Sequence, residues 1–198
     1  MKKRVIATLA LSTILLTPTN IFAKTFKDVN NDDWYYGVVS ELTDKGIING
    51  YEDNTFRPNK SVTLAEFLTL MNNTIGEKQV PNTDPNDNWF QPTFDELVSK
   101  GLDIVDYIQD PDYDITRNDM AEYLSLGLQK LKNETPDTTR PSGIKDFDKI
   151  PEEFQPYVAH LVNAGYIKGD HNNNFNGDSQ LTRAETAVII KAISGAVK

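Results

Sequence analysis

The chain has 198 residues, of which 29 are Asp or Glu and 20 are Lys or Arg, and its formal net charge at pH 7 is −9. An acidic surface repels the phosphates of nucleic acids and anionic lipid headgroups, so we expect neither as a partner. The sequence contains no cysteine, which excludes disulfides, cysteine nucleophiles and thiolate metal sites. We expect a fold held by its hydrophobic core, with no cofactor and no bound metal.

The N-terminus has the pattern of a secretory signal peptide, residues 1–23. A basic start, Lys2–Arg4, precedes the apolar run "VIATLALSTILL", which is too short to span a bilayer comfortably. Ala23 is a small residue at a suitable cleavage point. We therefore expect an exported mature chain that begins at Lys24 and has no membrane span after cleavage. An uncleaved membrane anchor is the alternative.

After this leader, one sequence pattern occurs three times. The segments "GIINGYEDNTFRPNKSVTLAE" (46–66) and "GYIKGDHNNNFNGDSQLTRAE" (165–185) align without a gap. A middle copy runs from "DNWFQPTFDELVSKGL" (87–102) to "ITRNDMAEYL" (115–124), with a shorter loop between them. The repetition predicts three similar structural units rather than one irregular domain.

The sequence pattern of each copy predicts a helix-loop-helix unit. A short amphipathic helix stops at a glycine, and a turn-rich loop of Asp, Asn, Gly and Pro leads to a second, more apolar helix. The second helix opens with threonine and has an acidic residue three positions later, which is the pattern of a capping box. No unit can bury its apolar face alone, so we expect a mainly α fold around a central three-helix bundle. The predicted units are 24–76, 82–132 and 143–198, with a polar linker at 133–142.

Two arginines are not explained by helix capping. Arg117 and Arg183 directly follow the capping threonine, at a position where a cation opposes the helix dipole. Each therefore requires an anion, which could be a nearby carboxylate or a ligand. The first copy has Leu64 at the same position, so the three copies are not equivalent.

The repeated pattern resembles the S-layer homology (SLH) family. The family motif opens with F-x-D-V and a tryptophan, continues with G-I-I-x-G-Y-x-D-x-T-F-R-P and ends in T-R-A-E. The first copy matches nearly throughout, with "FKDVNNDDWYY" and "GIINGYEDNTFRPNKSVTLAE", and the resemblance covers 26–196. It implies three tandem motifs in a pseudo-threefold arrangement. It also implies non-covalent anchoring to the pyruvylated secondary cell-wall polysaccharide of Gram-positive bacteria. We expect a secreted protein at the cell wall or S-layer surface, with other surface proteins as further partners.

The resemblance also implies where the ligand binds. In the family, the arginine of T-R-A-E faces the acidic pyruvyl-sugar in a groove between motifs, together with the tryptophan and aspartate at the start of the next motif. Arginine can bind such a carboxylate bidentately. The groove between the third and first copies then takes Arg183, Trp34 and Asp28, and we expect it to be the principal site.

Each of the other two grooves lacks one member of this set. Arg117 has no tryptophan partner in the third copy, and Trp89 would face Leu64 instead of an arginine. Core packing is the alternative role for the two tryptophans, and a salt bridge is the alternative for Arg117. The expected ligand-binding residues are Arg183, Trp34, Asp28, Arg117, Trp89, Glu185, Gly50 and Gly169.

Two further functions are weighed against glycan binding. Asp170, Asn172 and Asn174 have the spacing of an EF-hand loop, but Phe175 and Leu181 stand where that loop needs glycine and glutamate. An Asx-rich turn is the better interpretation. We also expect no enzyme, because the repeats leave little sequence for a catalytic domain and the only histidines, His160 and His171, lie inside the third copy.

A third alternative keeps the fold but changes the ligand. The missing arginine of the first copy and the missing tryptophan of the third are also what degenerate repeats would show if they had lost glycan binding. The chain would then be a secreted protein-interaction module.

Overall fold

The structure is a computed structural model that describes residues 26–76, 88–104 and 110–196. The predicted signal peptide, residues 1–23, lies outside this part of the chain. No helix within the described residues is long and apolar enough to cross a bilayer.

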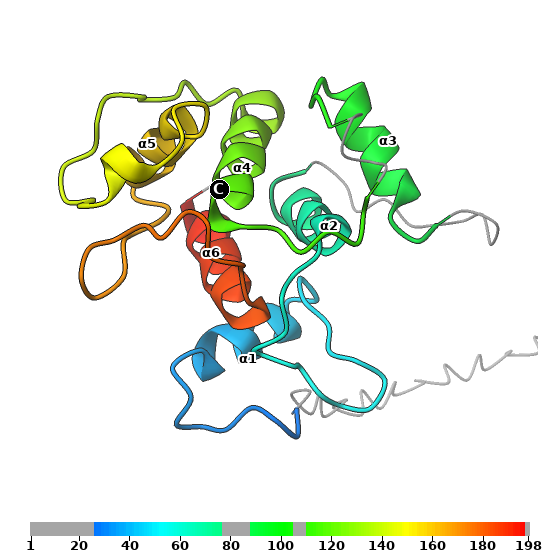
Figure 1. The fold of residues 1–198 in the computed structure, drawn as a ribbon. Helices are drawn as coiled ribbons and strands as arrows, with labels where there is room; N and C mark the ends of the chain where they lie inside the picture. Colours follow the sequence, from blue (N-terminus) through cyan, green and yellow to red (C-terminus); the bar gives the residue numbers. More distant parts are fainter. Residues whose placement is uncertain (1–25, 77–87, 105–109, 197–198) are drawn as a thin grey trace, which may run out of the picture.

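The protein is mainly helical, as the sequence predicts. Six α-helices and one short 3-10 helix, η2, form the regular structure of the described residues, and no strand is present among them (Figure 1). The first helix of each copy has 9 residues and the second has 12 to 16. The elements in chain order are α1 (Tyr36–Asp44), α2 (Leu64–Ile75), α3 (Gln91–Ser99), α4 (Arg117–Lys132), η2 (Phe147–Lys149), α5 (Gln155–Asn163) and α6 (Arg183–Ala196).

The helix boundaries follow the signals in the sequence. At the start of α2, the Thr63 side chain accepts a hydrogen bond from the Glu66 amide at 3.3 Å, and the Glu66 carboxylate accepts one from the Thr63 amide at 3.2 Å. Equivalent reciprocal bonds open α4 and α6. These capping boxes satisfy amide groups that a helix N-terminus leaves without an internal partner. Glycines with positive φ follow the first helix of each copy, at Gly46, Gly101 and Gly165.

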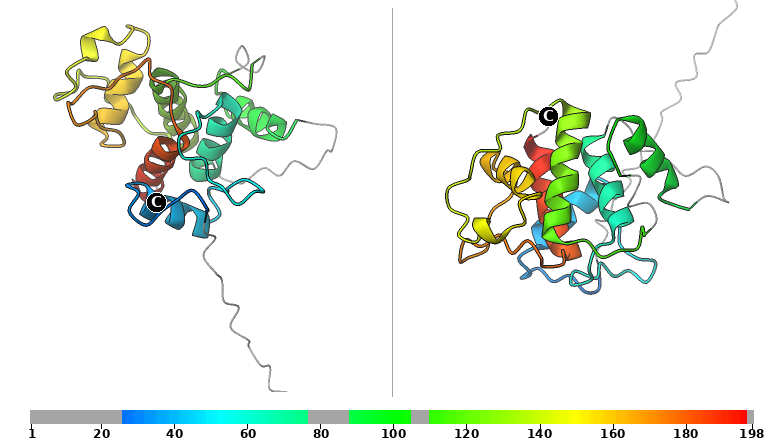
Figure 2. Two further views of the ribbon diagram at one scale, coloured as in Figure 1. Left: turned by 60° about the horizontal axis from the view of Figure 1, so that its bottom comes forward. Right: turned by 45° about the horizontal axis from the view of Figure 1, so that its top comes forward.

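The copies pack on one another in a cyclic order. The first helix of each copy lies against the second helix of the preceding copy, so α1 packs on α6, α3 on α2 and α5 on α4. The three second helices occupy the middle of the molecule, and α2 packs against both α4 and α6 (Figure 2). Every boundary between copies is therefore built from the same kinds of element.

A closed ring of backbone hydrogen bonds joins the three segments that precede the second helices. Val62 N donates to Leu181 O at 2.9 Å, Leu181 N to Ile115 O at 3.0 Å, and Ile115 N to Val62 O at 3.0 Å. All three side chains are fully buried. The ring fixes the N-termini of α2, α4 and α6 next to one another, and with them the arginines that open α4 and α6.

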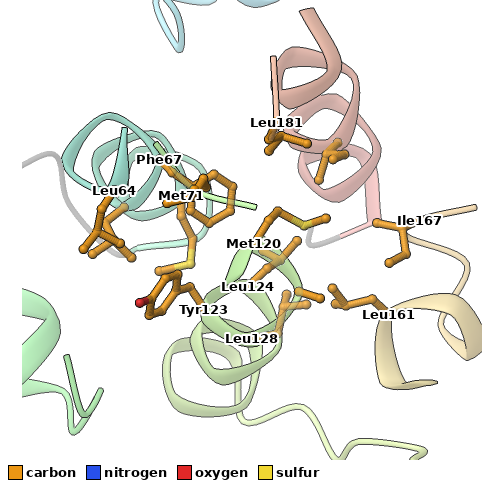
Figure 3. Packing of buried hydrophobic residues seen from close by; sticks show 14 of the residues in the cluster. Leu64, Phe67, Met71, Met120, Tyr123, Leu124, Leu128, Leu161, Ile167 and Leu181 are labelled. Atoms are coloured by element: carbon orange, nitrogen blue, oxygen red, sulfur yellow. The ribbon is translucent and has the colours of Figure 1, made fainter. Parts of the chain in front are cut away.

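The hydrophobic core has two parts. The larger cluster fills the space between α2, α4 and the elements around them, and Figure 3 shows Met71 of α2 close to Tyr123 and Leu124 of α4. The smaller cluster lies between α6 and the first copy, and it includes Phe26 and Phe56, whose ring centroids are 5.6 Å apart. The first helix and the loop of the first copy thus pack mainly against α6.

Substitution of Gly50 tests how tightly this smaller cluster is packed. A Cβ atom at this position would meet Phe26 Cε1 at 2.1 Å and the Thr55 backbone oxygen at 2.7 Å. We expect Gly50→Ala to cost about 1–3 kcal/mol of stability and several degrees of Tm, because overpacking forces a ring or the backbone to move. Thermal unfolding followed by circular dichroism measures this effect.

Gly37 gives a matched control within α1. A Cβ atom there would meet nothing within 4 Å, and alanine favours the helix over glycine. We expect Gly37→Ala to keep or raise the Tm. An unchanged Tm in Gly50→Ala would show that Phe26 can leave the cluster without cost.

Candidate binding grooves

Arg183 is docked on the loop of the first copy. Its Nε donates a hydrogen bond to Phe56 O at 2.8 Å, and one terminal nitrogen donates to Asn49 O at 3.1 Å. The guanidinium carbon also lies 4.9 Å from the Tyr51 ring centroid and 4.8 Å from that of Phe56. Carbonyls and aromatic faces orient the cation without neutralising its charge, so it stays available to an anion.

The cavity beside Arg183 contains a tryptophan, but not the expected one. It has a volume of about 180 Å³ and is lined by Arg183, Glu66, Asn49 and Trp89, among others. The Trp89 side chain is 54% exposed. Core packing therefore does not account for Trp89, and Trp34, the partner expected for Arg183, does not line this cavity. We call this cavity the Arg183 groove.

Trp34 belongs to a second cavity, which contains Arg117. This Arg117 groove has a volume of about 420 Å³, and Tyr166, Lys168 and Glu185 also line it. Trp34 is 66% exposed. Its indole is therefore free to contact a ligand at the surface, and core packing does not account for this tryptophan either.

Arg117 is held in the same way as Arg183. Its Nε donates to Phe175 O at 2.8 Å, and its guanidinium lies 5.0 Å from the Phe175 ring centroid. Burial lowers the pKa of Arg117, while the nearby carboxylates of Glu185 and Asp170 raise it. The guanidinium stays charged in either case. Among the described residues it makes no ion pair, so the alternative of a structural salt bridge is not supported there.

One rule describes both grooves. The arginine comes from one copy, the loop and the glutamate from the next copy, and the tryptophan from the copy after that. The tryptophan is displaced by one copy because α1 lies along α6. Trp34, just before α1, thereby reaches the side of α6 that carries Glu185, while Arg183 at the start of α6 reaches the first-copy loop.

The same rule places the missing arginine of the first copy and the missing tryptophan of the third copy in one interface. The third set of positions is Leu64, Asp119 and Glu153, together with the loop of the second copy, part of which (105–109) lies outside the described residues. Leu64 is buried, whereas Glu153 is exposed and offers no aromatic face. This interface has neither the arginine nor the tryptophan. The other two interfaces have both.

Glu185 and Glu66 have two roles each. The Glu185 carboxylate accepts hydrogen bonds from Thr182 N at 2.9 Å and Thr182 Oγ1 at 2.7 Å, and it also lines the Arg117 groove. Glu66 caps α2, lines the Arg183 groove and forms an ion pair with Lys60 at 3.0 Å. Capping fixes each carboxylate where it can accept a hydrogen bond from a ligand hydroxyl.

Asp28 has a structural role in the first copy. Its two carboxylate oxygens accept hydrogen bonds from Phe56 N at 2.7 Å and Arg57 N at 2.8 Å. Asp146 binds the equivalent amides of the third copy, Phe175 N at 2.6 Å and Asn176 N at 2.9 Å. Each aspartate braces the loop whose carbonyl oxygen holds a groove arginine, so it supports the grooves from behind.

The two glycines of the predicted site differ. Gly169 lines a cavity next to the Arg117 groove, together with Lys168 and Asp170. Gly50 packs against Phe26 in the smaller core cluster. The first-copy glycine therefore provides space for an aromatic ring.

The residues considered for calcium binding form an Asx turn. Asp170 Oδ1 accepts hydrogen bonds from Asn172 N at 2.8 Å and Asn174 N at 2.9 Å, and its Oδ2 accepts one from the Asn176 side chain at 3.1 Å. These hydrogen bonds brace the loop. Within 26–76, 88–104 and 110–196, no group of three or more His, Cys, Asp or Glu residues could hold a metal ion.

The two histidines are in different surroundings, and neither lies in a groove. His160 is buried between α5 and α4, with Nδ1 2.8 Å from Ser125 Oγ and Nε2 3.0 Å from Glu134 Oε1. His171 is exposed beside Asn172. The buried histidine links two helices and the linker that follows α4.

Comparison with known proteins identifies two segments of the chain. The family model of the S-layer homology domain matches residues 25–68 and 143–187, which lie in the first and third copies. An amylopullulanase from Thermoanaerobacterium thermosulfurigenes is 26% identical over 85% of the chain and 9% of its own length. The S-layer protein sap of Bacillus anthracis is 33% identical over 50% of the chain and 13% of its own length. A cellulosome-anchoring protein of Acetivibrio thermocellus is 30% identical over 39% of the chain, which is 19% of that protein. The chain therefore spans less than a fifth of each of these relatives.

Proposed function

Because two segments of the chain match the S-layer homology domain, we propose that the protein anchors non-covalently to the cell surface. The ligand is pyruvylated secondary cell-wall polysaccharide, bound in the Arg117 and Arg183 grooves. Relatives named as a cellulosome-anchoring protein, an S-layer protein and a middle cell wall protein support surface anchoring as the general role. The location that follows is secreted, at the cell wall or S-layer surface.

One observation carries the choice of ligand. Each groove is lined by three side chains that come from three different copies. They are a charged arginine, an exposed tryptophan and the glutamate that caps a second helix. The pyruvate ketal of a sugar is a carboxylate, and a hydrogen bond to a charged group contributes roughly 1.5–3 kcal/mol. An indole offers a flat apolar surface to the C–H face of the sugar ring, and glutamate accepts hydrogen bonds from its hydroxyls.

The grooves differ from the single principal site expected from the sequence. That expectation paired Arg183 with Trp34, whereas Trp34 shares a cavity with Arg117 and Trp89 shares one with Arg183. We therefore propose two binding grooves in each molecule. The third interface, with Leu64 in place of the arginine, does not bind the polysaccharide.

Binding without catalysis is part of the proposal. The relatives with enzyme names share 9%, 17% and 18% of their length with this chain. The shared part is the region that resembles the S-layer homology domain, so their enzyme names do not carry an activity over to this protein.

The test is calorimetric titration of residues 24–198 with short fragments of wall polysaccharide, each carrying one pyruvyl group, before and after chemical removal of pyruvate. We expect binding of the pyruvylated form with about two fragments per molecule, and a large loss of affinity after depyruvylation because the arginines lose their anion. Failure to bind either form would contradict glycan anchoring and favour the alternative of a protein-interaction module. Equal binding of both forms would contradict recognition of the ketal carboxylate.

A further inference from the structure

A polar cavity of about 420 Å³ lies beside the start of α4, outside the two grooves. It sits between α4, the region of η2 and the loop of the third copy. The side chains that matter for its chemistry are Asn118, Lys149, Asn176, Asp178 and Ser179. They offer both hydrogen-bond donors and acceptors, as the hydroxyl groups of a sugar require.

Asn118, which lines this cavity, has a side-chain acceptor without a hydrogen-bond partner in the described part of the chain. The residue is only 3% exposed, and its Nδ2 donates a hydrogen bond to Asp178 Oδ1 at 3.1 Å. Its Oδ1 is buried and has no hydrogen-bond partner among the described residues. A buried polar atom without a partner costs about 1–3 kcal/mol. A ligand hydroxyl that donates to Oδ1 would remove this cost.

Two residues distinguish this interface from the other two. Asn118 takes the position that Ala65 and Ala184 have in the other two copies. Its amide donates to Gly177 O at 2.9 Å, whereas the amides of Ala65 and Ala184 each donate to a proline carbonyl. A Cβ atom at Gly177 would lie 2.1 Å from Asn118 Oδ1. The asparagine therefore fits only because glycine replaces the proline.

The cavity is connected to the Arg117 groove through a third, smaller cavity of about 230 Å³. Asn174, Asn176 and Ser179 line both the smaller cavity and the Asn118 cavity. Arg117 and Lys168, together with Glu185, line both the smaller cavity and the groove. Three neighbouring cavities thus lead from Trp34 to Asn118.

We infer that the Arg117 groove continues into an extended polysaccharide-binding track, in which the Asn118 cavity binds the hydroxyl groups of a further sugar unit. This inference rests on the proposed function. Asp146, Asp178 and Lys149 all line the cavity, and no group of three or more His, Cys, Asp or Glu residues among the described residues could hold a metal ion. At the Arg183 groove, alanine and proline occupy the corresponding positions, Ala184 and Pro58, so we expect no equivalent extension there. The two grooves therefore differ in the length of polysaccharide that they recognise.

The experiment compares two probes prepared from pyruvylated secondary cell-wall polysaccharide, one of a single repeating unit and one of three. An Arg183→Gln background restricts binding to the Arg117 groove. We expect the longer probe to bind at least about tenfold more tightly, a difference of about 1.4 kcal/mol. The Asn118→Ala/Gly177→Pro variant installs the pair that both other interfaces already have. In it, the ratio of the two dissociation constants should fall to about three, the statistical factor for three equivalent units.

Asn118→Ala alone is the second variant. It removes a buried unpaired acceptor without adding bulk, so we expect it to fold and to lower the same ratio. Arg117→Gln, made in the same background, should weaken both probes. An unchanged ratio in both cavity variants, or a ratio near three before mutation, would overturn the extended track while glycan binding stands. Failure of the unmutated chain to bind either probe would overturn the track and the proposed function together.

Discussion

Arg117→Gln/Arg183→Gln is expected to weaken binding of pyruvylated wall polysaccharide strongly, with an affinity loss of about 10- to 100-fold. Each arginine is a charged donor in its groove, and a lost hydrogen bond to a carboxylate costs roughly 1.5–3 kcal/mol. Each single variant should halve the number of short pyruvylated fragments bound per molecule and leave the dissociation constant of the other groove nearly unchanged. Calorimetric titration gives both quantities.

Arg140→Gln is the matched control for these variants. Arg140 is exposed, pairs with Asp148 and lines neither groove, so its loss should leave binding unchanged. If Arg183→Gln alone removed all binding, the two-groove proposal would be wrong and a single principal site would be correct. Each variant is compared with the unmutated chain by thermal unfolding, because Nε of both groove arginines also binds a loop carbonyl.

Trp34→Ala is expected to weaken the Arg117 groove and not the Arg183 groove. A sugar face covers part of the indole, so the loss should be about five- to tenfold, somewhat less than full burial of an aromatic side chain would give. The effect should appear in the Arg183→Gln background, where the Arg117 groove is the site that remains. In the Arg117→Gln background, Trp34→Ala should cause no further loss of affinity.

The opposite pattern would restore the pairing expected from the sequence. An additive loss in both backgrounds would show that Trp34 supports the fold of the first copy as a whole. Tyr113→Ala is the control for loss of an exposed aromatic side chain, since Tyr113 is 44% exposed and lines neither groove. It should leave titration of both backgrounds unchanged.

The local structure could be predicted because its determinants lie close together in the sequence. A capping threonine and an acid three positions later meet within one helical turn, so Thr182 and Glu185 predict the start of α6 correctly. Glycine after the first helix predicts its end, and Gly165 has the positive φ that this requires. The same local argument identified Arg183 as a cation that capping does not explain.

The loops were predicted less completely, because a side chain can brace backbone far away in the sequence. Asp28 was expected to contact a ligand, but it binds amides at positions 56 and 57. The oxygen of Asn118 and the space beside Gly177 are also visible only when α4 meets the loop of the third copy. The sequence signal for this cavity is the asparagine at position 118, where the other two copies have alanine.

The sequence by itself determined the repeat, the mainly helical units, their capped second helices and the two arginines that helix capping does not explain. Tertiary structure alone decided which tryptophan joins which arginine. The spacing within a copy is the same whether its first helix packs on one neighbour or on the other. Packing of α1 along α6 is a choice between surfaces more than a hundred residues apart, and burial of apolar faces makes that choice. It brings Trp34 to Arg117 and leaves Trp89 beside Arg183.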